Sequence, residues 1–114
     1  MRIFDCFPFF NELTMLRFRL LELADVVDYF VLVESRETHT RQPKKLYFEE
    51  NKHLYKEYVD KIIHVVVDSL PSRDPFINTK YQRNQITRGL LRVRPHDTDV
   101  ICVCDADEIT NPEI

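Results

Sequence analysis

Residues 29–35 read YFVLVES: five apolar residues in succession, followed by an acid and a serine. A strand with one face in water alternates apolar and polar residues, whereas a nearly continuous apolar run is typical of a strand buried on both faces of a parallel sheet. We therefore predict a strand at Tyr29–Val33. Three other segments are similarly rich in Val, Ile, Phe or Cys and complete a set of four strands: Ile3–Phe7, Ile62–Val67 and Val100–Cys104.

Helical patterns lie between these strands. Leucines recur at spacings of three and four from Leu13 to Leu23, which predicts a helix with one apolar face. Asn11 is the expected N-cap of this helix, and Glu12 is placed to interact favourably with the helix dipole. A weaker helical pattern spans Phe48–Tyr58.

The third helix is predicted from about Thr79 to Val93, with Asn78 as its N-cap. It contains Gly89, the only glycine of the chain, at some cost in helix propensity. A close approach of this helix to the sheet would explain the glycine. The alternation of strands and helices implies an α/β fold with right-handed crossovers and a parallel sheet, and we predict the strand order 3-2-1-4.

The composition limits the classes of protein to consider. The chain has 114 residues, of which 44% are hydrophobic, which is enough for one domain with one core. Its net charge of -3, without a basic stripe, argues against nucleic acid as a partner. No apolar run approaches the ~20 residues of a membrane span, and the N-terminal segment does not read as a signal peptide. We expect a cytoplasmic protein if Met1 is the true start, although a piece cut from a Golgi-anchored chain would look the same.

The three cysteines are Cys6, Cys102 and Cys104, and their spacing does not suggest a disulfide framework. Cys102 and Cys104 alternate within the last predicted strand. We expect buried thiols there that pack as small hydrophobic side chains. Of the four histidines, His64 lies in an apolar strand and is expected to pack within it.

Acidic residues follow the predicted strands at their carboxyl ends. Glu34 follows the second strand, Asp68 the third, and the motif Asp105-Ala106-Asp107 the fourth. Ligands of open parallel sheets bind at this edge, and Mn²⁺ or Mg²⁺, which prefer oxygen ligands, would neutralise the carboxylates. An ion held by Asp105 and Asp107 can bridge diphosphate oxygens and stabilise a departing diphosphate. The alternative is a pair of solvated acids at the start of a further helix.

Arg83 lies in the helix that leads to the fourth strand. Two interpretations stay open for it. Either Arg83 belongs to a solvated helix face, or its guanidinium contacts the base or phosphate of a nucleotide at the strand ends.

Six segments, in order along almost the whole chain, resemble glycosyltransferase family 17. They are DCFPFFNEL at residues 5–13, VVDYFVLVES at 26–35, LYF at 46–48, KIIHV at 61–65, QRNQI at 82–86 and DADEI at 105–109. The combined set is far more specific than any single motif.

This resemblance implies a GT-A-type, Rossmann-like fold. It also implies an inverting transfer of N-acetylglucosamine from UDP-GlcNAc to a glycan or glycoprotein acceptor, such as an N-glycan, usually with Mn²⁺. By the family pattern, the Asp-x-Asp motif holds the metal and the diphosphate. Asn11 and Glu12 are expected near the nucleotide, Glu34 near uracil or ribose, and Arg83 near the nucleotide.

Members of the family continue well past the Asp-x-Asp motif, and that remainder supplies the acceptor site, further metal contacts and the general base. An inverting transfer needs a base to take the acceptor's proton, and this sequence shows no supported candidate. We expect residues 1–114 to bind UDP weakly in a crevice flanked by residues 7–12 and 105–107. Two alternatives stay open. One is a haloacid-dehalogenase-type phosphatase with Asp105 as nucleophile, although its motif usually follows the first strand. The other is a non-catalytic fragment that binds nucleotide sugar.

Overall fold

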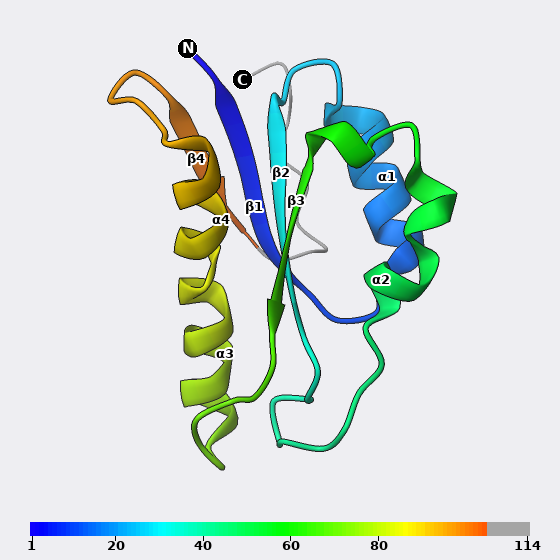
Figure 1. Cartoon of the computed structure of the whole chain (residues 1–114), viewed down its shortest axis with the longest axis vertical. Coiled ribbons are helices and arrows are strands. Elements are labelled where there is room, and N and C mark those ends of the chain that lie inside the picture. Colours follow the sequence, from blue (N-terminus) through cyan, green and yellow to red (C-terminus); the bar gives the residue numbers. More distant parts are fainter. Residues whose placement is uncertain (105–114) are drawn as a thin grey trace.

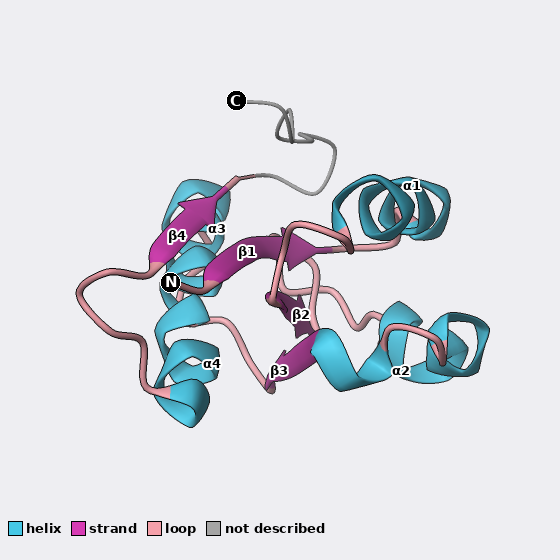
Figure 2. Ribbon diagram, turned by 90° about the horizontal axis from the view of Figure 1, so that it is seen from above, coloured by secondary structure: helices cyan, strands magenta, loops and turns pink. Residues whose placement is uncertain are grey.

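The computed structural model describes residues 1–104, which form a four-stranded sheet with helices on both faces (Figure 1, Figure 2). The order across the sheet is β3-β2-β1-β4, and every neighbouring pair of strands is parallel. The predicted α/β class, the parallel sheet and the 3-2-1-4 order are therefore confirmed. The strands are β1 (Ile3–Phe9), β2 (Tyr29–Ser35), β3 (Ile62–Val67) and β4 (Val100–Val103).

Two helical layers cover the sheet, and Figure 2 shows them on opposite faces. Among residues 1–104, no helix is long and apolar enough to cross a membrane. One layer contains α1 (Leu13–Leu23), α2 (Tyr47–Asn51) and the 3₁₀ turns η1 (Lys52–Tyr55) and η2 (Val59–Lys61), and the other contains α3 (Pro75–Asn84) and α4 (Ile86–Val93).

The start of α1 differs from the prediction. Its N-cap is Glu12 rather than Asn11, and no side chain caps the helix. The Glu12 carboxylate instead accepts a hydrogen bond from the backbone N–H of Phe10, at 3.1 Å. The assignment of Asn11 as N-cap is wrong because a tight turn after β1 sets the first helical residue one position later.

The predicted Thr79–Val93 helix is in fact two helices that meet at Gln85. The first of them begins at Pro75, and the side chain of its N-cap Asp74 accepts a backbone N–H of the first turn. Proline suits the first helical position because it has no N–H to satisfy there. Asn78, the predicted N-cap, is completely buried inside α3, so that assignment is wrong.

The predicted Phe48–Tyr58 helix is also shorter than expected. It ends at Asn51, and the chain continues in the two 3₁₀ turns. Phe48 and Tyr55 enter the core from this segment, whereas Leu54 is 50% exposed. Two anchoring aromatic residues are not the continuous apolar face that stabilises a long surface helix.

The core lies on both faces of the sheet. The face toward α1 and α2 carries large side chains, among them Phe7, Phe9 and Phe30. The face toward α3 and α4 carries mostly smaller ones, among them Val31 and Val65, with Phe4 as the large exception. The smaller side chains allow α3 and α4 to approach the sheet closely.

Gly89 lies where α4 meets the sheet. A Cβ atom at this position would be 2.6 Å from Val31 Cγ1 and 3.1 Å from Val65 Cγ2. Gly89 is buried, and there is no room for a side chain. The predicted close approach is confirmed, and it explains a glycine inside a helix despite its low propensity.

β4 departs from the prediction of a strand buried on both faces. It is one of the two edge strands of the described sheet, and Val100, Ile101 and Val103 are 41%, 43% and 48% exposed. Cys102 and Cys104 are half-buried rather than buried. The reason is position: α4 packs mainly on β2 and β3, so the described helices leave β4 largely uncovered.

Candidate functional site

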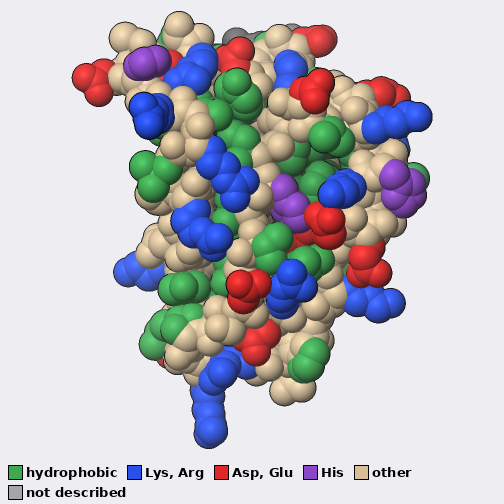
Figure 3. All heavy atoms as spheres, in the orientation of Figure 1, with side chains coloured by type: hydrophobic (Ala, Val, Ile, Leu, Met, Phe, Trp, Pro, Cys, Tyr) green, Lys and Arg blue, Asp and Glu red, His purple; other side chains and the backbone are tan. Residues whose placement is uncertain are grey.

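The carboxyl ends of the four parallel strands meet at one edge of the sheet, in the lower half of Figure 1. The chain adds β2 and β3 on one side of β1 and then returns to place β4 on the other side. This reversal between β1 and β4 is the topological switch point at which open α/β sheets bind ligands. Basic and acidic side chains lie next to one another in the same half of the space-filling view (Figure 3).

The turn from β1 into α1 borders the switch point. It contains Asn11 and Glu12, and Phe10 precedes them. Asn11 is exposed, Glu12 is half-buried, and the Phe10 side chain is 39% exposed. The structure therefore places both predicted nucleotide residues at the carboxyl edge, beside an aromatic ring that solvent reaches.

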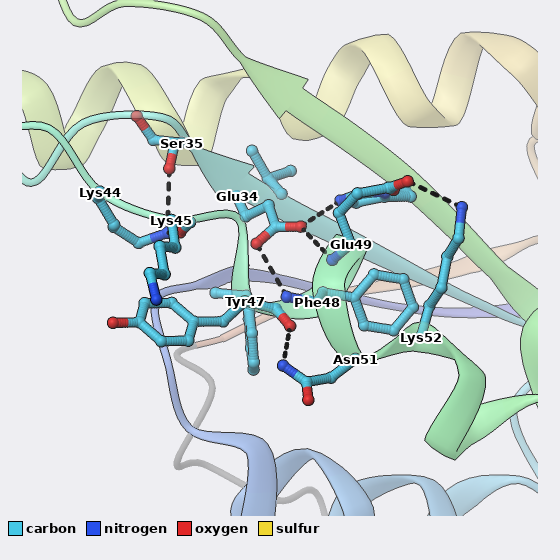
Figure 4. A network of polar contacts seen from close by, with 12 residues as sticks. Glu34, Ser35, Lys44, Lys45, Tyr47, Phe48, Glu49, Asn51 and Lys52 are labelled. Atoms are coloured by element: carbon cyan, nitrogen blue, oxygen red, sulfur yellow. Dashed lines mark hydrogen bonds and ion pairs between the residues drawn. The ribbon is translucent and has the colours of Figure 1, made fainter.

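Glu34, near the end of β2, is fully buried and is enclosed by partners from the protein itself (Figure 4). Its Oε1 accepts the backbone N–H of Phe48 at 3.1 Å, and its Oε2 accepts that of Glu49 at 3.1 Å. His64 Nε2, from β3, lies 2.5 Å from Oε2. A carboxylate at a helix N-terminus satisfies backbone donors that the helix leaves unpaired. Glu34 thus anchors the start of α2 to the sheet.

Lys44 lies next to this network and is half-buried. Its Nζ donates to the backbone carbonyls of Ser35 at 3.0 Å and Lys45 at 2.8 Å. The same ammonium is 5.3 Å from the ring centroids of both Phe10 and Tyr47. Burial lowers the pKa of Lys44, and the nearby carboxylates act in the opposite direction. Lys44 therefore provides positive charge at the carboxyl edge, between two aromatic rings.

Two buried amides on α3 hold the loops of this edge. Gln82 donates to the carbonyls of Val33 at 2.9 Å and Phe9 at 3.4 Å, near the ends of β2 and β1. Its Oε1 lies 2.9 Å from His39 Nε2, in the loop after β2. Asn78 donates to the carbonyls of His39 and Ser72, both at 2.7 Å, and so joins that loop to the one after β3.

Arg83 follows Gln82 on α3 and is half-buried. Its neighbour Gln82 contacts the carboxyl ends of β1 and β2, so this turn of α3 lies at the carboxyl edge. The structure thus brings α3, with Arg83, to the same edge as Asn11, Glu12 and Glu34.

A buried ion pair lies between β1, α1 and the end of β4. Arg19 is completely buried, and its Nε and Nη2 donate to Asp5 Oδ2 at 2.5 Å and Oδ1 at 2.7 Å. Its Nη2 also contacts Cys104 Sγ, and its Cζ lies 4.4 Å from the centroid of the Phe7 ring. Burial alone would lower the pKa of Arg19, but its hydrogen bonds with Asp5 and the charge of Asp5 outweigh that effect and raise it. The guanidinium therefore stays charged inside the protein.

Arg19, Asp5 and Gln82 were not predicted as site residues from the sequence. A signal was present for the ion pair: Arg19 occupies the leucine face of α1, three residues after Leu16, and Asp5 interrupts an apolar strand. Charged residues are almost never fully buried unless they are paired. No comparable signal marks Gln82, whose partners are backbone carbonyls.

Asp105 and Asp107, the predicted metal ligands, lie outside the described residues. Within residues 1–104, no group of three or more His, Cys, Asp or Glu side chains is placed to hold a metal ion. The chain reaches the motif from Cys104, whose N–H donates to the Cys6 carbonyl at 3.0 Å. Cys104 therefore continues the β1–β4 ladder one residue beyond the Cys6–Val103 pair.

These features define an α/β protein with a parallel sheet. Between β1 and β4 this sheet has a topological switch point, the position at which open α/β sheets bind ligands. The chain belongs to glycosyltransferase family 17, whose family model matches residues 1–114. The resemblance noted in the sequence is thus confirmed.

Two relatives illustrate the similarity. The β-1,4-mannosyl-glycoprotein 4-β-N-acetylglucosaminyltransferases of Rattus norvegicus and Homo sapiens are each 33% identical to this chain over 115 residues. The match covers 95% of this chain but 21% of the rat protein and 22% of the human protein. The chain therefore spans about a fifth of the length of these relatives. No solved structure matches it.

Proposed function

We propose that this chain forms the nucleotide-sugar-binding part of a GT-A-type glycosyltransferase. The reaction is a metal-dependent, inverting transfer of N-acetylglucosamine from UDP-GlcNAc. The observation that carries the proposal is the combination of family membership with a switch point next to β4, the strand that leads into the Asp-x-Asp motif. Membership of this family also argues against the dehalogenase-type phosphatase.

The nucleotide is assigned to the carboxyl edge of the sheet at the switch point between β1 and β4. Asn11 and Glu12, in the turn after β1, and Arg83, on α3, are the residues proposed to contact it. Glu34 acts at the uracil or ribose end of this site. Because its carboxylate already has three donors around it, we assign it an indirect role: it holds α2 and the preceding segment with Lys44 in place.

Asp105 and Asp107 are the proposed ligands of Mn²⁺ or Mg²⁺. The donor set fits, because carboxylate oxygens are the ligands that these ions prefer. The position of β4 also fits this assignment, because the described part of the strand ends at the switch point. When bound, such an ion neutralises charge on the diphosphate and stabilises it as it departs.

The acceptor is proposed by class. The names of the rat and human relatives specify a mannosyl-glycoprotein acceptor and transfer of N-acetylglucosamine. We extend that class to this chain and propose a mannose-containing glycan.

Calorimetric titration with UDP, with and without Mn²⁺, tests the nucleotide and metal assignments. We expect weak binding that requires Mn²⁺ in the native protein. Asp107→Asn removes a charge with little change in shape and should weaken that binding roughly tenfold or more, the scale found even for groups that only orient a metal ligand. Asp97→Asn is the matched control, because Asp97 is exposed and precedes β4 at the opposite edge of the sheet.

Two outcomes would contradict this assignment. Equal UDP binding by the native protein and an Asp105→Ala variant would exclude the proposed site. Hydrolysis of an aryl phosphate that is abolished by Asp105→Asn would favour the phosphatase instead.

A further inference from the structure

The end of β4 is tied to the rest of the protein by the Asp5–Arg19–Cys104 cluster, in which Arg19 is completely buried and Asp5 is 2% exposed. Arg19 reaches from α1, Asp5 lies in β1, and Cys104 follows the last residue of β4. Cys104 Sγ also lies 3.7 Å from Asp5 Oδ1. Three separate elements therefore meet at the residue that immediately precedes Asp105.

A buried ion pair is an inefficient way to stabilise a fold. Removing two charges from water carries a desolvation cost that their attraction often fails to exceed, and apolar residues of similar volume frequently stabilise as well. Such a pair does, however, define position sharply, because a bidentate guanidinium–carboxylate contact has a narrow geometry. Because the cluster includes Cys104, this narrow geometry constrains the carboxyl end of β4.

β4 needs such a constraint. It is a short edge strand, exposed on its faces, and among residues 1–104 it pairs only with β1. Its amino end is held by another ion pair, since Arg2 Nη2 lies 3.1 Å from Asp99 Oδ2 and the Arg2 backbone N–H donates to Asp99 at 2.8 Å. The two ends of one strand thus carry one ion pair each, and only the carboxyl-end pair is fully buried.

We infer that Arg19, Asp5 and Cys104 are positioning residues that fix the carboxyl end of β4, from which the sequence continues into the Asp-x-Asp motif, and that they thereby support the divalent-cation binding proposed for Asp105 and Asp107. This inference rests on the proposed function for the identity of the metal ligands. The ordering of the strand end itself does not depend on that function. Groups that orient metal ligands without touching the ion commonly change metal affinity by about 10- to 100-fold when they are replaced.

The first measurement is hydrogen exchange in the native protein and its variants, without metal. Replacing Cys104 by Ala removes the thiol contact and keeps the Asp5–Arg19 pair. We expect faster exchange of the residue-104 N–H and unchanged exchange of the Val100 N–H, which donates to the Arg2 carbonyl at 2.9 Å. Asp99→Asn, at the other end of β4, should give the reverse pattern. Equal exchange of the residue-104 N–H in the native protein and Cys104→Ala would overturn the inference.

The second measurement is the Mn²⁺ concentration needed for UDP binding. We expect Cys104→Ala to raise this Mn²⁺ concentration roughly tenfold. Cys104→Ser should change it by no more than about twofold, because the serine hydroxyl still accepts a hydrogen bond. Asp99→Asn should leave it unchanged. Arg19→Lys keeps the charge and loses the bidentate contact, so it should raise the Mn²⁺ requirement as much as Cys104→Ala does. Combining the two substitutions should raise the requirement little further, because both act on the same cluster. If Arg19→Lys fails to fold, the comparison of Cys104→Ala with Cys104→Ser still tests the positioning role.

The possible failures are distinguishable. If the native protein binds UDP without Mn²⁺, the proposed function is wrong in its metal requirement, and the positioning role falls with it even where hydrogen exchange shows an ordered strand end. If the native protein requires Mn²⁺ but Cys104→Ala has the native requirement, only the positioning role is wrong. If Asp99→Asn raises the Mn²⁺ requirement as much as Cys104→Ala does, β4 is loosened as a whole, and the positioning role is also wrong.

Discussion

Replacing Glu34 by Gln should destabilise the protein by about 2–4 kcal/mol. The carboxylate accepts the N–H groups of Phe48 and Glu49 and contacts His64, all without exposure to solvent. A glutamine keeps one oxygen and presents an NH₂ group in place of the other, so at least one backbone N–H loses its acceptor. A hydrogen bond to a charged group contributes about 1.5–3 kcal/mol, and a buried donor left unpaired costs about 1–3 kcal/mol. The lower desolvation cost of an amide offsets part of this loss.

Urea unfolding is the assay, with Glu50→Gln as the matched control. Glu50 lies in the first turn of α2 but is exposed, so the control removes the same charge from the same helix terminus. That interaction is worth about 0.3–1 kcal/mol. The two variants should therefore differ by at least about 1 kcal/mol in free energy of unfolding, which is a substantial part of a typical total of about 5–15 kcal/mol.

Two results would refute this reasoning. If both variants have the same stability, Glu34 does not anchor α2 in the way its contacts indicate. If Glu34→Gln is as stable as the native protein but binds UDP more weakly, the carboxylate acts directly on the nucleotide instead.

Two further perturbations test other parts of the structure. Gly89→Ala places a methyl group against Val31, and we expect overpacking of about 1–3 kcal/mol to exceed the ~1 kcal/mol gained in helix propensity. Urea unfolding should show the sign reversed in a Val31→Ala background, and an equal gain in both backgrounds would contradict the close contact. Backbone N–H groups of His96 and Arg2 lower the pKa of Asp99 to about 2, so its ionised form stabilises the fold above pH ~4 and this contribution is lost as the pH falls toward 2. Asp99→Asn should flatten that part of the stability–pH curve, and an unchanged slope would show that Asp99 does not couple to folding.

The sheet was predictable because its signal is strong and local. A run such as Tyr29–Val33 has no polar position to place in water, so it requires cover on both faces, and the helical segments between the runs supply that cover. The same rule failed for Val100–Cys104, whose apolar run looks identical. The predicted strand order 3-2-1-4 already places this strand at an edge of the sheet, and an apolar run does not show which of the two edge strands the helices cover.

The helix starts were harder because several residues compete for one role. Asn78 and Asp74 are both favoured N-cap residues, and the sequence analysis chose the wrong one. The deciding cue was Pro75, which fits the first turn of a helix and would disrupt a later one. Asn78 was then free for a different task inside α3, where its amide joins two loops.

The sequence predicts where the candidate site lies but not the contacts that support it. Acids after parallel strands point to the carboxyl edge, and Asn11, Glu12 and Glu34 lie at that edge in the structure, while their role toward a nucleotide stays a prediction. The partners of Glu34 are backbone N–H groups of α2, and a sequence does not show where backbone donors will point. For the same reason Glu34 was expected beside a ligand, whereas the structure surrounds its carboxylate with the protein's own donors.

The distribution of buried polar side chains gives an independent reason to place function at this edge. Glu34, Ser35, Asn78 and Gln82 are buried at or near the carboxyl ends of the strands, and Arg19 with Asp5 is buried where β4 ends. Each such group carries a desolvation cost that its hydrogen bonds must offset, so a fold selected for stability alone would favour apolar residues there. The contacts they make are specific. Glu34 holds the start of α2, and Asn78 and Gln82 hold the loops after β2 and β3. Arg19 holds the carboxyl end of β4. At the opposite edge, the Arg2–Asp99 pair is partly exposed and holds a single strand end. The costly contacts therefore gather where loops and strand ends must hold a defined shape, which is the requirement of a binding site.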